Sequence, residues 1–243
     1  MRTQSIAAKP GDRLVDVWRF GCCGVALALL PTIWAAGDNL ASPPRPVVWT
    51  LDSAAWAGGL QATVLGTPRF VDNGVGPAAC FNGKDDGLVF PVNPIAGWSQ
   101  FTIEVLFRPD ADGAEAQRFL HIEDERQSRA LIEIRLTPEG RWSLDTFLLS
   151  GENGLPLLDR AKLHPAGRWY WVALVYDGKK EAHFVDGTKE MEGEVAFAPM
   201  TKGQTSLGVR LNRVFWFKGG IREVRFSPTA LGPAELQRPP KSD

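Results

Sequence analysis

The sequence predicts an all-β fold, and three of its features carry that prediction. Apolar and polar residues alternate with a period of two in segments such as FTIEVLFR (101–108), as in a strand with one face in a core. Asp-Gly pairs at positions 177–178 and 186–187 follow apolar segments and indicate hairpin turns. The 243 residues include 25 Gly and 18 Pro, which suits many short strands joined by turns, and no internal repeat or heptad pattern is present. We therefore expect one all-β domain with little helix.

The stretch RWYWVALVYDGKKEAHFVDG (168–187) predicts the centre of this fold. Its first half, Trp169–Tyr176, is apolar or aromatic at every position, so both faces of the strand are expected to be covered and the strand to lie inside a sheet. The first Asp-Gly pair turns the chain into a return strand, Glu181–Val185, and the second pair turns it again. Two corners in one short stretch predict a β-meander.

Composition excludes one class of partner. The formal net charge is −1, from 27 basic and 28 acidic residues, so the chain lacks the concentrated basic surface that nucleic acid requires. The 44% hydrophobic content allows a sizeable core. Nine Trp leave two uses open, as core residues or as part of a binding surface.

The N-terminal residues predict a secretory signal. Residues 1–20 carry four basic and two acidic side chains, and the segment Phe20–Ala36 that follows is uncharged and about as long as a signal-peptide apolar region. Small residues at Ala35, Ala36 and Gly37 offer a cleavage region, whereas an uncleaved segment would remain as an anchor. We expect a secreted or periplasmic protein whose only membrane contact is this segment.

Domain boundaries follow from this segment and from the linker after it. We predict a signal peptide or anchor at 1–36, a Pro-rich linker at 37–46, a folded domain at 47–238 and a tail at 239–243. Three prolines in ASPPRP (41–46) favour a stiff, extended linker. Helix is expected only as a short helix-capable tail at Gly232–Gln237.

The cysteines allow no internal disulfide in the folded domain. Cys22 and Cys23 lie inside the apolar leader, which leaves Cys80 alone. Cys80, between Ala79 and Phe81, is predicted to be a buried small apolar residue, with a reactive thiol as the alternative.

Alternation and turn residues place the remaining strands. Turns are indicated where Gly, Pro, Asn and Asp cluster, at 72–74, 83–87, 109–110 and 138–140. A loop without strands is expected at Ser150–Pro165. Between these breaks, strands are predicted at Val47–Leu51, Ala62–Leu65, Arg69–Val71, Ala79–Asn82, Leu88–Phe90, Phe101–Arg108, Arg118–Glu123, Leu131–Leu136, Trp142–Leu148, Ser206–Leu211, Phe215–Phe217 and Ile221–Phe226.

Four segments carry a resemblance to a known superfamily. CFNGKDDGLVFP (80–91), FTIEVLFRP (101–109), RWYWVALVYDG with FVDG (168–187), and SLGVR with FKGGIREVRFSPTALGPAEL (206–236) resemble laminin-G-like domains of the concanavalin A-like lectin/glucanase superfamily, in the form found in secreted bacterial proteins. The resemblance runs from about Val47 to the C-terminus. It implies a jelly-roll sandwich of two antiparallel sheets, one of them concave, whose outer face binds or cleaves glycans in many members. Some members bind calcium, and others bind only proteins.

Catalytic patterns of the superfamily are absent from the sequence. Its laminarinase-type hydrolases place carboxylates in an E-x-D-x-x-E pattern on one strand face, whereas Glu123, Asp124 and Glu125 are adjacent and point apart. Of the alginate-lyase patterns, only FWFKGG (215–220) is faintly similar, and His121 lacks the preceding Gln-Ile. We predict no catalytic residue and keep an enzyme as an alternative.

A candidate ligand surface follows from polar residues at alternate strand positions. Arginine pairs with carboxylates and sulfates, so an acidic polysaccharide such as a uronate is the expected ligand if these strands are neighbours. The alternative is that the arginines and glutamates pair with each other on a solvated sheet. His121 is a further candidate contact or a plain polar residue, and two tryptophans are candidates for stacking on sugar rings. The predicted binding residues are Glu104, Arg108, His121, Glu133, Arg135, Trp142, Arg210, Asn212 and Trp216.

The sequence alone does not decide whether the protein binds a metal. Asp72, Asn73, Asp85 and Asp86 lie in loops rich in oxygen ligands, which suit calcium, but their spacing matches no EF-hand loop and plain Asx turns explain them equally. No cofactor is required. We therefore expect an extracytoplasmic, lectin-like, carbohydrate-binding domain, with a polysaccharide lyase or glycoside hydrolase and a protein-protein adhesion module as the alternatives.

Overall fold

The computed structural model describes residues 45–52, 56–72 and 76–239. The predicted leader, most of the predicted linker and the last four residues lie outside this part of the chain. The described residues form antiparallel strands and contain no helix, so no helix there is long and apolar enough to span a membrane. The predicted all-β class is confirmed.

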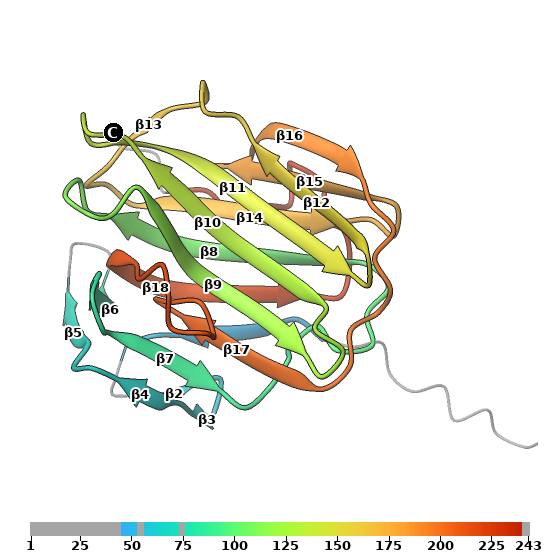
Figure 1. The fold of residues 1–243 in the computed structure, drawn as a ribbon, viewed down its shortest axis with the longest axis horizontal. Coiled ribbons are helices and arrows are strands. Elements are labelled where there is room, and N and C mark those ends of the chain that lie inside the picture. The colour runs from blue at the N-terminus through green and yellow to red at the C-terminus, as the bar shows by residue number, and fades with distance from the viewer. Residues whose placement is uncertain (1–44, 53–55, 73–75, 240–243) are drawn as a thin grey trace, which may run out of the picture. The chain divides into compact units, whose positions relative to one another are not determined.

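Two eight-stranded antiparallel sheets make up the fold. In Figure 1 one of them faces the viewer, and we call it the front sheet; its strand order is β12-β11-β10-β9-β17-β7-β4, with β13 paired to β11. Its strands are β4 (Thr63–Leu65), β7 (Gly87–Phe90), β9 (Ala116–Asp124), β10 (Arg129–Leu136), β11 (Arg141–Ser150), β12 (Asn153–Leu158), β13 (His164–Pro165) and β17 (Gly203–Leu207).

The back sheet lies behind the front sheet in Figure 1, with strand order β16-β15-β14-β8-β18-β6-β5 and β1 paired to β18. Its strands are β1 (Val47–Thr50), β5 (Arg69–Asp72), β6 (Pro77–Asn82), β8 (Phe101–Pro109), β14 (Tyr170–Tyr176), β15 (Lys180–Val185), β16 (Thr188–Glu194) and β18 (Lys218–Ser227). A separate two-stranded ribbon joins β2 (Trp56–Ala57) and β3 (Leu60–Gln61).

The predicted meander is confirmed as β14, β15 and β16. Strand β14 lies between β15 and β8, with both faces buried, as its continuous apolar sequence predicts. Asp177 accepts the backbone N–H groups of Lys179 and Lys180 at 2.8 and 2.7 Å, and Gly178 has φ +95°, which glycine adopts without strain. The first Asp-Gly corner therefore fixes the register of the hairpin.

Aromatic side chains from both sheets fill the space between them. Phe107 of β8 and Phe119 of β9 stack at 4.4 Å between ring centroids, and Trp142 of β11 meets Phe107 edge-on at 5.1 Å. Tyr170 completes the group at 5.0 Å from Trp142 and donates its hydroxyl to Pro165 O at 2.7 Å. These contacts explain why Trp142 is fully buried. The stacking role on a sugar that the sequence suggested for Trp142 is therefore wrong.

Several predicted elements differ in the structure. The segment Ser150–Pro165 contains two strands, β12 and β13; β12 lies at the edge of the front sheet, where Pro156 is tolerated. The segment Phe215–Phe217 is no strand, because Phe215 has φ +61°, and the tail at Gly232–Gln237 forms only a turn. Cys80 is half-buried rather than buried.

Candidate functional site

Four charged residues form a network on the outer face of the front sheet. Strands β9, β10 and β11 are neighbours, and their register aligns Arg118 with Glu133 and Glu133 with Asp145. Arg118 Nε lies 2.5 Å from Glu133 Oε1, and Arg135 Nη1 lies 3.0 Å from Glu133 Oε2. Arg135 also pairs with Asp145 through its second terminal nitrogen. The two carboxylates are therefore shared between two arginines.

Burial changes the pKa of one carboxyl in this network. Glu133 and Asp145 expose only 4% and 6% of their side chains. Burial raises the pKa of Asp145 to about 6, while Arg135 opposes the shift and Glu133 adds to it. The carboxyl of Asp145 thus takes up a proton close to neutral pH, and its hold on Arg135 weakens there.

A loop over residues 208–217 crosses the edge of the network and adds a cation and an aromatic ring. Gly208 has φ +80° and accepts Phe217 N at 2.8 Å, while Arg118 N donates to Phe215 O at 2.9 Å. Phe215 is 42% exposed, and the guanidinium carbon of Arg118 lies 3.8 Å from the centroid of its ring. The loop therefore presents an exposed ring directly beside the charged network.

Arg210 is the cation that this loop contributes. Together with the network it lines a hollow of about 190 Å³, whose walls also include Leu131, Phe147 and Pro156. Among the described residues, no ion pair or hydrogen bond engages its guanidinium. Partial burial and then the charges of Arg118 and Arg129 lower the pKa of Arg210, as expected where positive charge is in excess.

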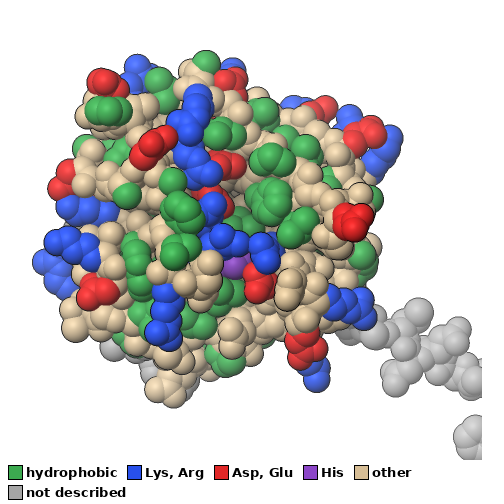
Figure 2. All heavy atoms as spheres, viewed as in Figure 1, with side chains coloured by type: hydrophobic (Ala, Val, Ile, Leu, Met, Phe, Trp, Pro, Cys, Tyr) green, Lys and Arg blue, Asp and Glu red, His purple; other side chains and the backbone are tan. Residues whose placement is uncertain are grey.

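Figure 2 shows the surface that results. Basic side chains follow one another across the middle of the front-sheet face, with acidic side chains between them and hydrophobic side chains on both sides. Three arginines and two carboxylates line the hollow of about 190 Å³, so its lining carries one positive charge in excess, that of Arg210.

His121 lies beneath the same loop instead of at the surface. Only 1% of the residue is exposed, and its Nδ1 accepts the N–H of Leu211 at 3.1 Å. Burial, followed by the charges of Arg210, Arg129 and Arg118, lowers the pKa of His121 to about 3. His121 is therefore neutral and positions the loop, and it does not reach a ligand on this face.

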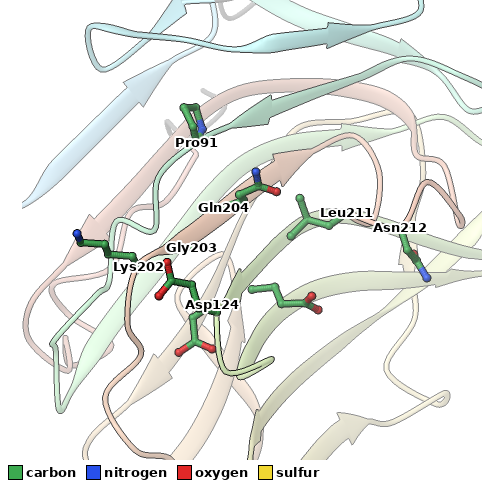
Figure 3. Close-up of a pocket in the computed structure, with 9 residues that line it drawn as sticks. Pro91, Asp124, Lys202, Gly203, Gln204, Leu211 and Asn212 are labelled. Atoms are coloured by element: carbon green, nitrogen blue, oxygen red, sulfur yellow. The ribbon is translucent and has the colours of Figure 1, made fainter.

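A larger hollow of about 680 Å³ is lined by two further residues of the same loop, Leu211 and Asn212, and by residues of β9 and β17. In Figure 3, Gln204 and Leu211 lie side by side, with Asn212 farther along and Lys202 and Asp124 toward the other end. Asp124 is committed to the fold, because it accepts the N–H groups of Arg126, Ser128 and Thr201 at 2.8–2.9 Å. Gln204, Asn212, Lys202 and the carboxylate of Glu125 remain as hydrogen-bonding groups for a ligand.

The structure brings together some of the predicted residues and separates others. Glu133, Arg135 and Arg210 meet at the smaller hollow, and Asn212 lines the larger one. Glu104 and Arg108 lie on the back sheet, where Glu104 is buried and accepts Gln237 N at 2.7 Å. Burial raises the pKa of Glu104, although the Gln237 N–H opposes this.

The two predicted aromatic contacts also miss the site. Trp142 belongs to the core, and Trp216 is half-buried and lines neither hollow. Phe215, its neighbour in the loop, is the exposed ring.

Sequence reasoning missed Arg118, Asp145 and Phe147. Plain alternation puts positions 118 and 121 on opposite faces of a strand, but the register shifts between Ile132 and Glu133, and this irregularity turns both residues outward. Asp145 and Phe147 did carry a signal, because they share a face with Ser143 in the alternation of β11.

The loops suggested for calcium are held by their own backbone contacts. Asp86 accepts Thr67 N at 2.8 Å and Asn82 N at 3.0 Å, and Asp85 accepts the Asn82 side-chain amide at 2.7 Å. Within the described ranges, no three His, Cys, Asp or Glu side chains converge as metal ligands. Asn73 lies outside these ranges. The Asx turn of this loop is made by Asn82, whose Oδ1 accepts the N–H groups of Lys84 and Asp85 at 2.9 and 3.1 Å.

Comparison with known proteins identifies the fold. A family model described as the concanavalin A-like lectin/glucanases superfamily matches residues 82–237. A search of curated protein sequences finds no match. Among solved structures, the similar chains include domain 4 of AbnA, a GH43 extracellular arabinanase from Geobacillus stearothermophilus, in complex with arabinotriose. That match has a TM-score of 0.59 and 21% identity, and covers 79% of this chain and 96% of the other.

Two further similar structures are larger proteins. Botulinum neurotoxin type C, whose cell entry depends on two ganglioside molecules, matches with a TM-score of 0.56 and 10% identity over 79% of this chain and 49% of the toxin chain. Trypanosoma rangeli sialidase in complex with sialic acid matches with a TM-score of 0.55 and 17% identity over 77% of this chain and 31% of the sialidase. At these identities the likeness establishes the fold alone, which confirms the predicted jelly-roll sandwich.

Proposed function

This chain belongs to the concanavalin A-like lectin/glucanases superfamily, and from that premise we propose that it binds carbohydrate on the outer face of the front sheet. The ligand we propose is an acidic polysaccharide, whose carboxylate or sulfate groups enter the hollow lined by Arg118, Arg135 and Arg210. Two of the similar structures hold arabinotriose or sialic acid, and cell entry of the similar toxin depends on gangliosides. These ligands support a glycan as the class of ligand. The uncharged segment Phe20–Ala36 favours an extracytoplasmic location.

One observation carries the proposal. Arg210 stands without an ion pair among the described residues, beside a network whose two arginines and two carboxylates balance, so an anion bound at Arg210 need not displace an existing pair. An arginine presents a planar fork of N–H groups that matches a carboxylate or a sulfate. The exposed ring of Phe215, which lies against Arg118, offers an apolar surface for a sugar ring.

The first prediction concerns Arg210 itself. Replacing Arg210 by Ala should weaken binding of an oligogalacturonate about 10- to 100-fold, because a charge-assisted hydrogen bond contributes about 1.5–3 kcal/mol. Titration of the full-length protein, followed by the amide resonances of Phe215 and Asn212, reports on this face directly. Arg210→Lys should restore part of the affinity.

Arg213→Ala is the matched control for this experiment, because Arg213 is exposed in the same loop and lines neither hollow. Absence of binding to uronate, sulfated and neutral oligosaccharides alike would refute the proposal. Release of reducing ends or of unsaturated uronate from the polysaccharide would instead favour the enzymatic alternative. Capture of a protein partner without glycan would favour adhesion.

The second prediction concerns pH. Because the pKa of Asp145 is raised to about 6, lowering the pH from 7 to 5 protonates this carboxyl and releases Arg135 for a ligand anion. Affinity for a sulfated oligosaccharide, which stays charged throughout, should rise several-fold over this range. Asp145→Asn should bind with the higher affinity at both pH values. Equal pH dependence in the variant and the wild type would contradict this role of Asp145.

A further inference from the structure

A second basic hollow lies on the outer face of the back sheet, away from the site described above. It is formed where β5, β6, β18 and β8 lie next to one another, and it measures about 370 Å³. This volume is within the roughly 300–1,000 Å³ of typical small-molecule pockets. Four cations line it, Arg69, Lys84, Arg108 and Lys218.

The acidic side chains in this hollow do not use up its cations. Two carboxylates line it and a third, Asp112, pairs with Lys218 from outside the lining, so the count leaves one positive charge over. Asp86 accepts the backbone N–H groups of Thr67 and Asn82, and Asp110 forms an ion pair with Arg108 Nη2 at 3.3 Å. Arg69 and Lys84 are exposed, and neither has an ion pair within the described part of the chain. The hollow therefore has two cations available to an anion.

Arg108 adds a donor that points to a missing acceptor. Its Nε is buried and has no hydrogen-bond partner among the described residues, although its Nη2 reaches Asp110. Leaving a buried N–H without an acceptor costs about 1–3 kcal/mol. An oxyanion in the hollow would supply that acceptor together with partners for Arg69 and Lys84.

An aromatic ring lies next to one of these cations, just outside the residues that line the hollow. The Arg108 guanidinium carbon is 5.9 Å from the ring centroid of Trp169, which is half-buried. Trp169 lies against Gly220; a Cβ at position 220 would approach the ring to 3.0 Å, so glycine leaves room for the ring there. An indole beside an arginine is suited to an anionic sugar, whose ring stacks while its charged group is paired.

We propose that this hollow is a second binding site for a sugar that bears a carboxylate or sulfate group. Arg108, Arg69 and Lys84 bind the anionic group, and Trp169 contacts the sugar ring. Because the two hollows lie on outer faces of different sheets, one domain would hold two acidic chains, or two segments of one chain. The second site does not depend on the first.

Cys80 provides a direct test, since its half-buried side chain lines this hollow. In the full-length protein, alkylation of Cys80 is followed by mass spectrometry of the peptide that contains it, with and without a hexamer of galacturonate. We expect the hexamer to slow alkylation at least fivefold. The protection should be lost in Arg69→Ala/Lys84→Ala and kept in Arg210→Ala. Calorimetry should give two hexamers per chain in the wild type and one in either variant.

Several results would overturn this proposal. The proposal fails if the hexamer does not protect Cys80, or if the protection disappears in Arg210→Ala. It also fails if inorganic sulfate, at the same concentration of charged groups, protects Cys80 equally. The two sites can also fail separately. If Arg210→Ala changed nothing while Arg69→Ala/Lys84→Ala abolished both binding and protection, the second site would stand and the function proposed for the front sheet would fall.

Discussion

Replacing Glu181 by Gln is expected to raise the free energy of unfolding at pH 9 by on the order of 4 kcal/mol, which is a large fraction of a typical domain's stability. Glu181 points from β15 into the space between the sheets and is fully buried. Neither carboxyl oxygen has a hydrogen-bond partner of normal geometry among the described residues. Burial raises its pKa to about 8; Thr146 and the backbone of Leu148 oppose the shift, and Asp145 adds to it.

The sign of the pH dependence follows from this shift. Between the ordinary pKa of 4.5 and about 8, the folded state holds a proton on Glu181 that the unfolded state has lost. Stability contributed by this protonation is present below pH 4.5 and is lost as the pH rises through this window. Glutamine does not ionise, so the variant should show no such loss.

Urea unfolding at pH 5 and pH 9 measures the effect. The wild type should lose stability between the two values, and Glu181→Gln should lose much less. Glu192→Gln is a matched control, because Glu192 lies on the next strand, exposed and paired with lysines, and its variant should behave as the wild type. An equal loss in the wild type and in Glu181→Gln would show that Glu181 does not hold a proton in the fold.

The fold was largely predictable because its main strands alternate and its corners carry Asp-Gly pairs. The pattern failed where a strand need not alternate. Strand β12 is an edge strand with Pro156 in it, so its sequence lacked a strand signal. The apolar triplet Phe215–Phe217 had a strand signal, but the loop that crosses the front sheet requires a positive φ at Phe215. Local pattern cannot include that tertiary requirement.

The candidate site was predictable only in part, for a different reason. A period of two says which residues share a face of one strand, but not which strands share a sheet or which face is the outer one. Glu133 and Arg135 were correctly placed together with Arg210. Glu104 and Arg108 had the same pattern, yet β8 belongs to the other sheet. Trp142 alternates as the others do, and its face is the core.

The second large effect is expected at acidic pH, where His121→Asn should retain on the order of 3 kcal/mol more stability than the wild type at pH 4. The pKa of His121 is lowered from 6.5 to about 3, by burial first and by Arg210, Arg129 and Arg118 next. Between these values the unfolded state binds a proton that the folded state does not. Stability from neutral His121 is therefore complete above pH 6.5 and is lost as the pH falls toward 3.

Asparagine is the informative substitution because its Oδ1 takes the place of the histidine Nδ1, which accepts Leu211 N. The variant keeps an acceptor for the loop that carries Arg210 and Asn212, but it cannot be protonated. Acid titration of stability, together with hydrogen exchange at Leu211, separates the two roles. The wild type should lose protection at Leu211 as the pH falls, whereas the variant should keep it.

A parallel acid loss in the wild type and in His121→Asn would contradict this account. His121 Nε2 lies 3.5 Å from a Glu123 carboxylate oxygen, so such a result would mean that the pair is already charged in the fold. A charged His121 could no longer accept the Leu211 N–H, because both of its ring nitrogens would be donors. The loop that places Arg210 over the front sheet would then be held by Arg118 N at Phe215 O and by Phe217 N at Gly208 O instead.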